Sequence, residues 1–298
     1  MRFGFLAVVA MALLVANPAS AEIRADQLGD ASWYLHVDLG EMKKGPAGSQ
    51  LYAWLQREIF SEIQKELKID VARHIDRLTA IGVGDSEMTL ILDGPFPSSV
   101  RKSLLEWVGR AAKKSVDGKA YYRPDARSLK RENIDVEMDD PNLSFALDNR
   151  IVFTTSEALM KTVLRNNGTL PKPGDPRDAL MVLSATRSLV QAGGRSDAFN
   201  IDSEEWDSKL LRNTQKVALL VADLEGQLGL DARLQAKEPE LAESLANVIR
   251  GLIGLSYFSE DDSAPMQLLR GTRVRVESGT LRLRLTLDPD TVVSALTE

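Results

Sequence analysis

TRVRVESGTLRLRLTL, residues 272–287, alternates apolar and polar side chains on either side of the dipeptide Ser278-Gly279. A period of two is that of a β-strand, in which successive side chains point to opposite faces. Two such runs joined by a two-residue polar turn are typical of an antiparallel hairpin. The register that follows pairs Glu277 with Thr280, Arg275 with Arg282, and Arg273 with Arg284.

One face of this predicted hairpin carries four arginines. The outward residues are Arg273, Arg275, Arg282 and Arg284, and the inward ones are Val274, Val276, Leu281, Leu283, Leu285 and Leu287. Like charges directly opposite each other destabilise a sheet by a few tenths of a kcal/mol or more. The arginines therefore need an anionic neighbour or abundant water. An anionic ligand or an envelope partner is one candidate, because guanidinium groups hold carboxylates and phosphates bidentately. We take the four arginines as candidate binding residues.

A strand of opposite charge is predicted in the first half of the chain. Residues 134–139 place Ile134, Val136 and Met138 inward and Asp135, Glu137 and Asp139 outward. We hypothesise that this acidic face meets the arginine face, within one chain or between two copies. The alternative is that the two faces are solvated independently.

Strands and helices alternate along the rest of the chain. Period-two patterns predict strands at residues 32–39, 78–83, 88–93, 120–123, 134–138, 143–147, 151–154, 180–185, 216–224 and 228–235. Helical spacing of apolar residues predicts helices at 50–68, 97–111, 156–164, 206–211, 239–253 and 290–296. Ser49 is the expected N-cap of the first helix, after a break at Gly45–Gly48.

Both halves of the chain repeat this order: strand, helix, strand, strand, helix, hairpin and short helix. The predicted fold class is α+β, with two similar units, each an antiparallel sheet with helices on one face, produced by internal duplication. The first unit spans residues 22–168, a Gly- and Pro-rich linker spans 169–178, and the second unit spans 179–298. The alternative is coincidence, since alternating elements are common.

Two stretches resemble segments of bacterial exported proteins of unknown function. They are DASWYLHVDL, residues 30–39, and FALDNRIVFTTSEAL, residues 145–159. In those proteins a strand hairpin that ends in such a Ser-Glu-Ala-Leu helix start recurs. The resemblance covers most of the chain after residue 21 and implies two related α+β units. It brings no activity and no site residues with it.

The N-terminus has the pattern of a secretory signal peptide. Arg2 precedes an apolar run from Phe3 to Val15, and Ala19-Ser20-Ala21 supplies small residues for cleavage. We expect cleavage after Ala21 and a periplasmic location. The apolar run is shorter than the roughly 20 residues that span a bilayer, and we expect no membrane span after cleavage.

Composition excludes several classes of chemistry. The chain has no cysteine, so disulfides, thiol catalysis and cysteine-ligated metals are ruled out. Residues 22–298 contain 36 basic and 43 acidic residues, and this acidic balance argues against nucleic acid as a partner. We expect no cofactor and no metal site. The partners we expect are an envelope protein or a second copy of the chain.

Known catalytic motifs are incomplete. Ser99 and Lys102 match S-x-x-K of penicillin-binding enzymes, but the partner motifs of that class are absent. Gly84-Asp85-Ser86 resembles an esterase block, but both histidines, His36 and His74, precede it in the chain. We therefore expect a non-catalytic periplasmic binding or accessory protein that engages an envelope protein or an anionic ligand. Two alternatives stay open: a periplasmic hydrolase with an unrecognised carboxylate pair, and a sensor or inhibitor whose open sheet edge captures a partner strand.

Overall fold

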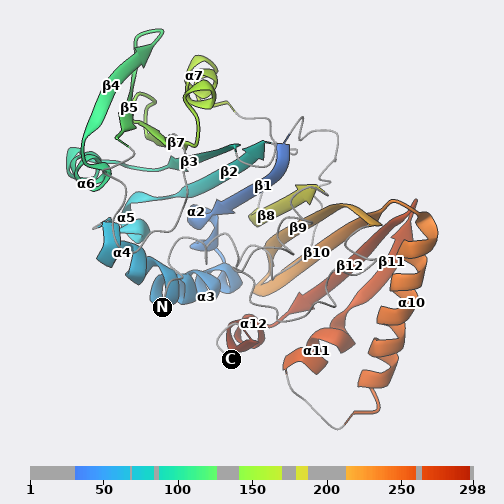
Figure 1. Ribbon diagram of the computed structural model, residues 1–298. Helices are drawn as coiled ribbons and strands as arrows, with labels where there is room; N and C mark the ends of the chain where they lie inside the picture. The colour runs from blue at the N-terminus through green and yellow to red at the C-terminus, as the bar shows by residue number, and fades with distance from the viewer. Residues whose placement is uncertain are drawn as a thin grey trace.

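A computed structural model describes residues 31–67, 69–83, 87–125, 141–169, 179–186, 213–259 and 264–295. These residues form one antiparallel sheet in the order β11-β12-β10-β9-β8-β1-β2-β3-β7-β6-β5-β4, with helices packed against it (Figure 1). The fold is α+β, as the sequence predicts. None of the helices described is both long and apolar enough to cross a membrane.

The described residues of the first half form seven strands. They are β1 (Ala31–Asp38), β2 (Arg77–Val83), β3 (Glu87–Asp93), β4 (Ala111–Val116), β5 (Lys119–Pro124), β6 (Asn142–Ser144) and β7 (Arg150–Thr154). Its helices are α2 (Leu39–Met42), α3 (Pro46–Leu55), the π-helical turn η2 (Gln56–Phe60), α4 (Ser61–Leu67), α5 (Val71–His74), α6 (Ser98–Val108) and α7 (Glu157–Arg165).

The second half of the chain contributes five strands within the described residues. They are β8 (Ala179–Thr186), β9 (Thr214–Leu224), β10 (Gln227–Ala236), β11 (Arg273–Glu277) and β12 (Thr280–Leu287). The helices of this half are α10 (Pro239–Ser256), α11 (Ala264–Gly271) and α12 (Pro289–Ala295).

The two halves share one sheet because β1 and β8 pair with each other. Leu35 of β1 lies opposite Leu183 of β8, in an antiparallel ladder. In each half the first three strands are neighbours in sequence order, and the last strand returns to pair with the third, β7 with β3 and β12 with β10. A duplication would produce this shared order. The duplication itself and the domain boundaries stay predictions.

The first long helix begins earlier than expected. We predicted an N-cap at Ser49, but α3 starts at Pro46, with Gly45 as its cap. Proline is well suited to the first helical position, where its missing N–H would have no intrahelical partner. Gly48 lies inside the helix and close to α2, since a Cβ on Gly48 would come within 2.6 Å of the Met42 carbonyl oxygen.

The core lies mainly between one face of the sheet and a layer of helices. Leu51 and Trp54 of α3 and Leu104 of α6 are buried there against strand residues such as Val221 and Leu230. The helix α7 covers the opposite face instead: it buries Met160, Val163 and Leu164 together with Tyr121 and Val152. Figure 1 shows α7 on one side of the sheet and α3, α4 and α12 on the other.

The C-terminal hairpin has the predicted register. Arg275 lies opposite Arg282 and Arg273 opposite Arg284. Ser278 and Gly279 turn the chain with φ angles of 49° and 77°. Both values are positive, as the favoured two-residue hairpin turn requires. The prediction of this hairpin is therefore confirmed residue by residue.

Candidate functional site

The four candidate arginines share one face at the end of the sheet. Directly opposite residues of an antiparallel pair lie on the same face, so the register places all four together. Arg273 and Arg275 of the edge strand β11 are exposed. Arg282 and Arg284 of β12 are partly buried.

The residue that organises this face is Asp231 of β10. Its side chain is almost fully buried, with 4% of the residue exposed. Arg233 Nε donates to Asp231 Oδ1 at 3.0 Å, and Arg282 Nε donates to Oδ1 and Oδ2 at 2.9 and 2.8 Å. Arg282 also donates through its terminal amine to Oδ2, and Arg284 Nε donates to Oδ2 at 3.2 Å. One carboxylate therefore holds three guanidinium groups.

Asp231 stays ionised in this setting. Burial alone would raise the pKa of Asp231, because it disfavours the charged form. The hydrogen bonds from Arg282 and Arg233 outweigh that effect and hold the pKa of Asp231 below its ordinary range. Asp231 is therefore charged at neutral pH. It orients the arginines around it and does not act as a proton donor.

The charge on this face is strongly positive. The register adds Arg233 and Gln235 of β10 and Lys216 of β9 to the side that carries the four arginines. The described carboxylates on the same side of β9–β12 are Asp231 and Glu277. This local positive charge contrasts with the acidic excess of the whole chain. A cationic surface of this kind is suited to an anionic partner. We call Arg273, Arg275, Arg282, Arg284 and Arg233 the arginine face.

The structure supplies an anionic neighbour that the sequence analysis did not name. Asp231 takes this place for Arg282 and Arg284. The acidic side chains proposed for it, Asp135, Glu137 and Asp139, lie outside the described residues. Their contact with the arginine face stays a hypothesis. The signal in the sequence was an aspartate between Leu230 and Ala232, inside an alternating strand, where an acid is unusual.

A second charged cluster lies at the other end of the sheet. Glu157, at the start of α7, accepts hydrogen bonds from Lys114 Nζ at 2.7 Å and Tyr121 Oη at 2.8 Å. Lys161 and Arg123 complete the cluster, at 2.8 and 3.3 Å from the carboxylate oxygens. Hydrogen bonds from Lys114, Lys161 and Tyr121 lower the pKa of Glu157 to about 2. This cluster ties α7 to β4 and β5.

The two histidines and the nearby Asp38 make local contacts. His36 Nδ1 lies 2.9 Å from Thr79 Oγ1, and Asp38 caps α2 by accepting from the Glu41 N–H at 2.7 Å. His74 Nδ1 lies 3.1 Å from the carbonyl oxygen of Pro95. Within the described ranges, no three His, Cys, Asp or Glu side chains come together as a metal site would require.

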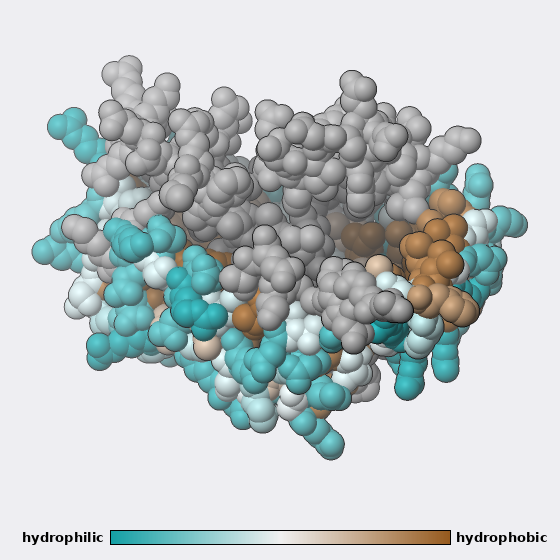
Figure 2. All heavy atoms as spheres, turned by 90° about the horizontal axis from the view of Figure 1, so that it is seen from below, coloured by the Kyte–Doolittle hydropathy of each residue, from teal (hydrophilic) through white to brown (hydrophobic). Residues whose placement is uncertain are grey.

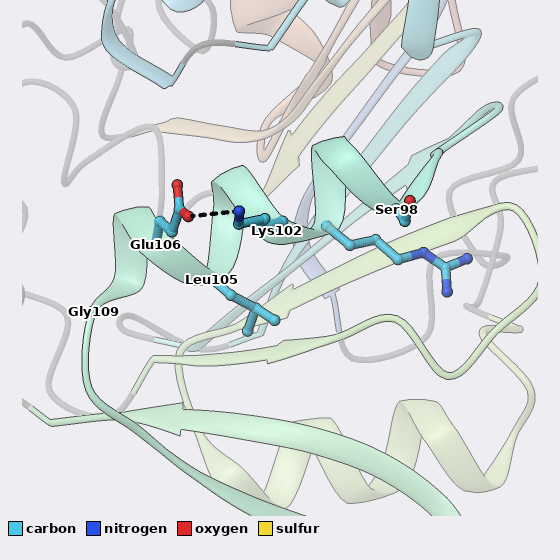
Figure 3. Close-up of a pocket in the computed structure, with 6 residues that line it drawn as sticks. Ser98, Lys102, Leu105, Glu106 and Gly109 are labelled. Carbon is cyan, nitrogen blue, oxygen red and sulfur yellow. Dashed lines mark ion pairs between the residues drawn. The ribbon is translucent and has the colours of Figure 1, made fainter.

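The S-x-x-K segment forms the exposed side of α6. A wide, open depression there is lined by Ser98, Arg101, Lys102, Leu105, Glu106 and Gly109 (Figure 3). Lys102 Nζ lies 3.7 Å from Glu106 Oε1, and 78% of the Lys102 side chain is exposed. A solvated ion pair on an exposed helix is an ordinary surface feature. Ser99, the serine of the motif, is not among the residues that line the depression.

Comparison with known proteins gives structural likeness only. No protein-family model matches the chain, and no curated protein matches it. The solved structures similar to it include crystal form IV of TP0453, with 11% identity, a TM-score of 0.50 and coverage of 96% of this chain and 99% of that one. Crystal form III of TP0453 has 11% identity, a TM-score of 0.48 and coverage of 94% and 99%. At this identity the likeness shows the fold alone.

Proposed function

We propose that this chain is an exported, non-catalytic binding protein that holds an anionic group of an envelope partner on its arginine face. The observation that carries the proposal is the arrangement around Asp231, in which a buried carboxylate positions Arg233, Arg282 and Arg284. These three guanidinium groups outnumber the one carboxylate, so they place net positive charge behind the exposed Arg273 and Arg275 of β11.

The outer arginines are the groups that contact the partner. Arg273 and Arg275 are exposed on β11, and neither forms an ion pair with any residue that the structure describes. The inner arginines already share Asp231, so they contribute net positive charge behind the outer pair. A carboxylate or phosphate that approaches β11 would meet two guanidinium groups that are ready to bind it bidentately.

One feature of the sequence supports the location. The N-terminal residues 1–21 have the pattern of a cleavable signal peptide. An envelope partner is therefore the expected source of the anionic group.

The test compares three baits in an affinity capture from envelope extract: the wild-type chain, Arg273→Glu with Arg275→Glu, and a charge-matched control. The control is Arg101→Glu with Lys113→Glu, two exposed residues on α6 and β4 that are remote from the arginine face in the strand order. We expect a protein that wild type and control retain and the β11 variant loses, with retention falling as salt is raised. Equal retention by all three folded baits would contradict the proposal.

A further inference from the structure

The strand β11 forms one edge of the sheet. Among the strands that the structure describes, its only neighbour is β12. The residues that flank a two-residue hairpin turn form a hydrogen-bonded pair, and such pairs then alternate along the strands. Glu277, Arg275 and Arg273 therefore bond to β12. The backbone N–H and C=O groups of Val274 and Val276 point away from the sheet, and the described part of the chain offers no partner to them.

The two faces of this edge differ in chemistry. Arg273 and Arg275 are exposed on one face. Val274 and Val276 are on the other, where they pack beside α10 against a cluster that includes Ala242, Ala246 and Leu281. A strand added at this edge would therefore place alternate side chains beside arginines and beside an apolar surface.

The apolar surface extends onto α10. The large hydrophobic side chains of α10 that are exposed are Val248, Leu252 and Leu255, at 61%, 48% and 67%, and the exposed Tyr257 and Phe258 follow the end of the helix. Figure 2 shows hydrophobic side chains gathered at the right-hand side of the molecule, the side where α10 lies in Figure 1. A patch of this kind on an otherwise charged surface is characteristic of an interaction site.

Helical spacing places this flank of α10 on the side of the open edge. Val248, Leu252 and Leu255 follow each other at intervals of four and three residues, so they share one flank of α10. Tyr257 lies on the opposite flank, where its hydroxyl donates to the carbonyl of Arg270 in α11 at 3.1 Å. Because α11 packs against β12 and α12, it occupies the flank of α10 nearer the middle of the sheet. The apolar flank therefore faces outward, past β11.

We propose that β11 binds an extended segment of a partner protein as an additional antiparallel strand, and that the side chains of this segment alternate between acidic and apolar. The acidic side chains pair with Arg273 and Arg275, and the apolar ones pack beside Val274, Val276 and the outer flank of α10. The segment also satisfies the outward N–H and C=O groups of the two valines. This inference rests on the proposed function, since it names the partner chemistry of the same face.

The probe is a fluorescent peptide, acetyl-Thr-Glu-Val-Glu-Val-Glu-Val-Thr-amide, titrated with the full chain and followed by anisotropy. In an antiparallel ladder, hydrogen-bonded partners have side chains on the same face, so the peptide valines bond to Val274 and Val276. We expect N-methylation of the peptide valines to weaken binding tenfold or more, whereas N-methylation of its glutamates leaves it within threefold. A peptide of the same composition with its acids grouped together is expected to bind at least tenfold more weakly.

Two variants of the chain test the same backbone hydrogen bonds by changing β11 instead of the peptide. Val274→Pro removes one outward N–H and keeps the pairing of β11 with β12, because an edge strand tolerates proline on its open side. We expect it to weaken peptide binding tenfold or more, and the matched Val274→Thr, which keeps the N–H, to stay within threefold. Circular dichroism of both variants checks that the fold is retained.

The outcomes separate this inference from the proposed function. If Arg273→Glu with Arg275→Glu abolishes binding while Val274→Pro and valine N-methylation leave it unchanged, the arginines bind the acids without strand addition. That result overturns this inference and leaves the proposed function standing. Sedimentation could instead show a dimer that the Arg273→Glu with Arg275→Glu variant dissociates, with no binding of the peptide. That result would assign the edge to a second copy of the chain and would also overturn this inference.

Discussion

Asp231 binds Arg282 diagonally across the β10–β12 pair. The residue directly opposite Asp231 is Arg284, and Arg282 lies opposite Arg233. The carboxylate nevertheless makes its closest contacts with Arg282 and a longer one, at 3.2 Å, with Arg284. This diagonal bond brings Arg233 and Arg282, two like charges in directly opposite positions, onto a common anion.

Loss of that anion should destabilise the C-terminal strands. Asp231→Ala leaves Arg233, Arg282 and Arg284 facing one another without a counter-charge. Removal of one partner from a buried charge pair costs about 3 kcal/mol or more, and we expect a loss of about 3 kcal/mol in the free energy of unfolding. Urea denaturation at neutral pH measures it. Glu277→Ala is the control, since this exposed carboxylate on the same face should change the free energy by less than about 0.5 kcal/mol. Equal effects of the two substitutions would contradict this account of Asp231.

The acid stability of the protein should depend on Glu157. Its pKa is lowered from 4.5 to about 2 in the folded chain. A depressed folded-state pKa means that the unfolded chain takes up the proton first as pH falls. The stabilisation from Glu157 is therefore fully present above about pH 4.5 and is lost as pH falls towards 2. We expect the difference in unfolding free energy between wild type and Glu157→Gln to shrink between pH 6 and pH 2.5, in urea titrations at each pH. Glu106→Gln, on the exposed side of α6, is the control. The difference in unfolding free energy between wild type and this variant should stay small from about pH 6 to about pH 2.5. A constant difference for Glu157→Gln would refute the assignment.

Gly82 leaves room for the indole of Trp33. The two residues lie opposite each other on β2 and β1, and a Cβ on Gly82 would come within 1.8 Å of Trp33 Nε1. Gly82→Ala should therefore cost about 1–3 kcal/mol through overpacking. The cost should fall by at least about 0.5 kcal/mol when Trp33 is also changed to Ala, because residues in contact couple. A double-mutant cycle in thermal unfolding measures the coupling, and strict additivity would show that the close approach is not the cause.

Asp223 joins the two halves of the chain. Its Oδ2 accepts from the Gly48 N–H of α3 at 3.0 Å, and its Oδ1 accepts from the Gly226 N–H in the β9–β10 turn at 2.9 Å. Asp223→Ala should cost about 1–3 kcal/mol, since it leaves two backbone donors without their acceptor. Asp223→Asn keeps one oxygen and should cost less. Urea denaturation of both variants checks the order, and the reverse order would show that the charge of Asp223 matters more than its two bonds.

The sequence predicted the fold best where local pattern and turn chemistry agree. The hairpin of β11 and β12 follows from strict alternation around Ser278-Gly279, and its register is confirmed. By contrast β4, with the sequence AAKKSV, has no apolar alternation and was not predicted. Its position depends on pairing with β5 and on the contacts of Lys114 with Glu157. The turn to β5 is the dipeptide Asp117-Gly118, with positive φ angles of 49° and 77° that are typical of a two-residue hairpin. That local signal was overlooked because β4 itself shows no apolar alternation.

The candidate site was predicted in part. The four arginines were identified by their alternation, and the structure places them on one face. Their common anion, Asp231, was missed because its strand was interpreted alone, without its neighbour in the sheet. The pairing of β10 with β12 brings residues 231 and 282 together, and their separation in sequence gives no local sign of it.

The pairing of β1 with β8 has a consequence for synthesis of the chain. The residues of β1 emerge from the ribosome well over a hundred positions before those of β8, and until then one long edge of the first seven strands has no partner. Unpaired edges of this length recruit other chains. A first half that folds before the second half is available would therefore present β1 as an open edge to other chains.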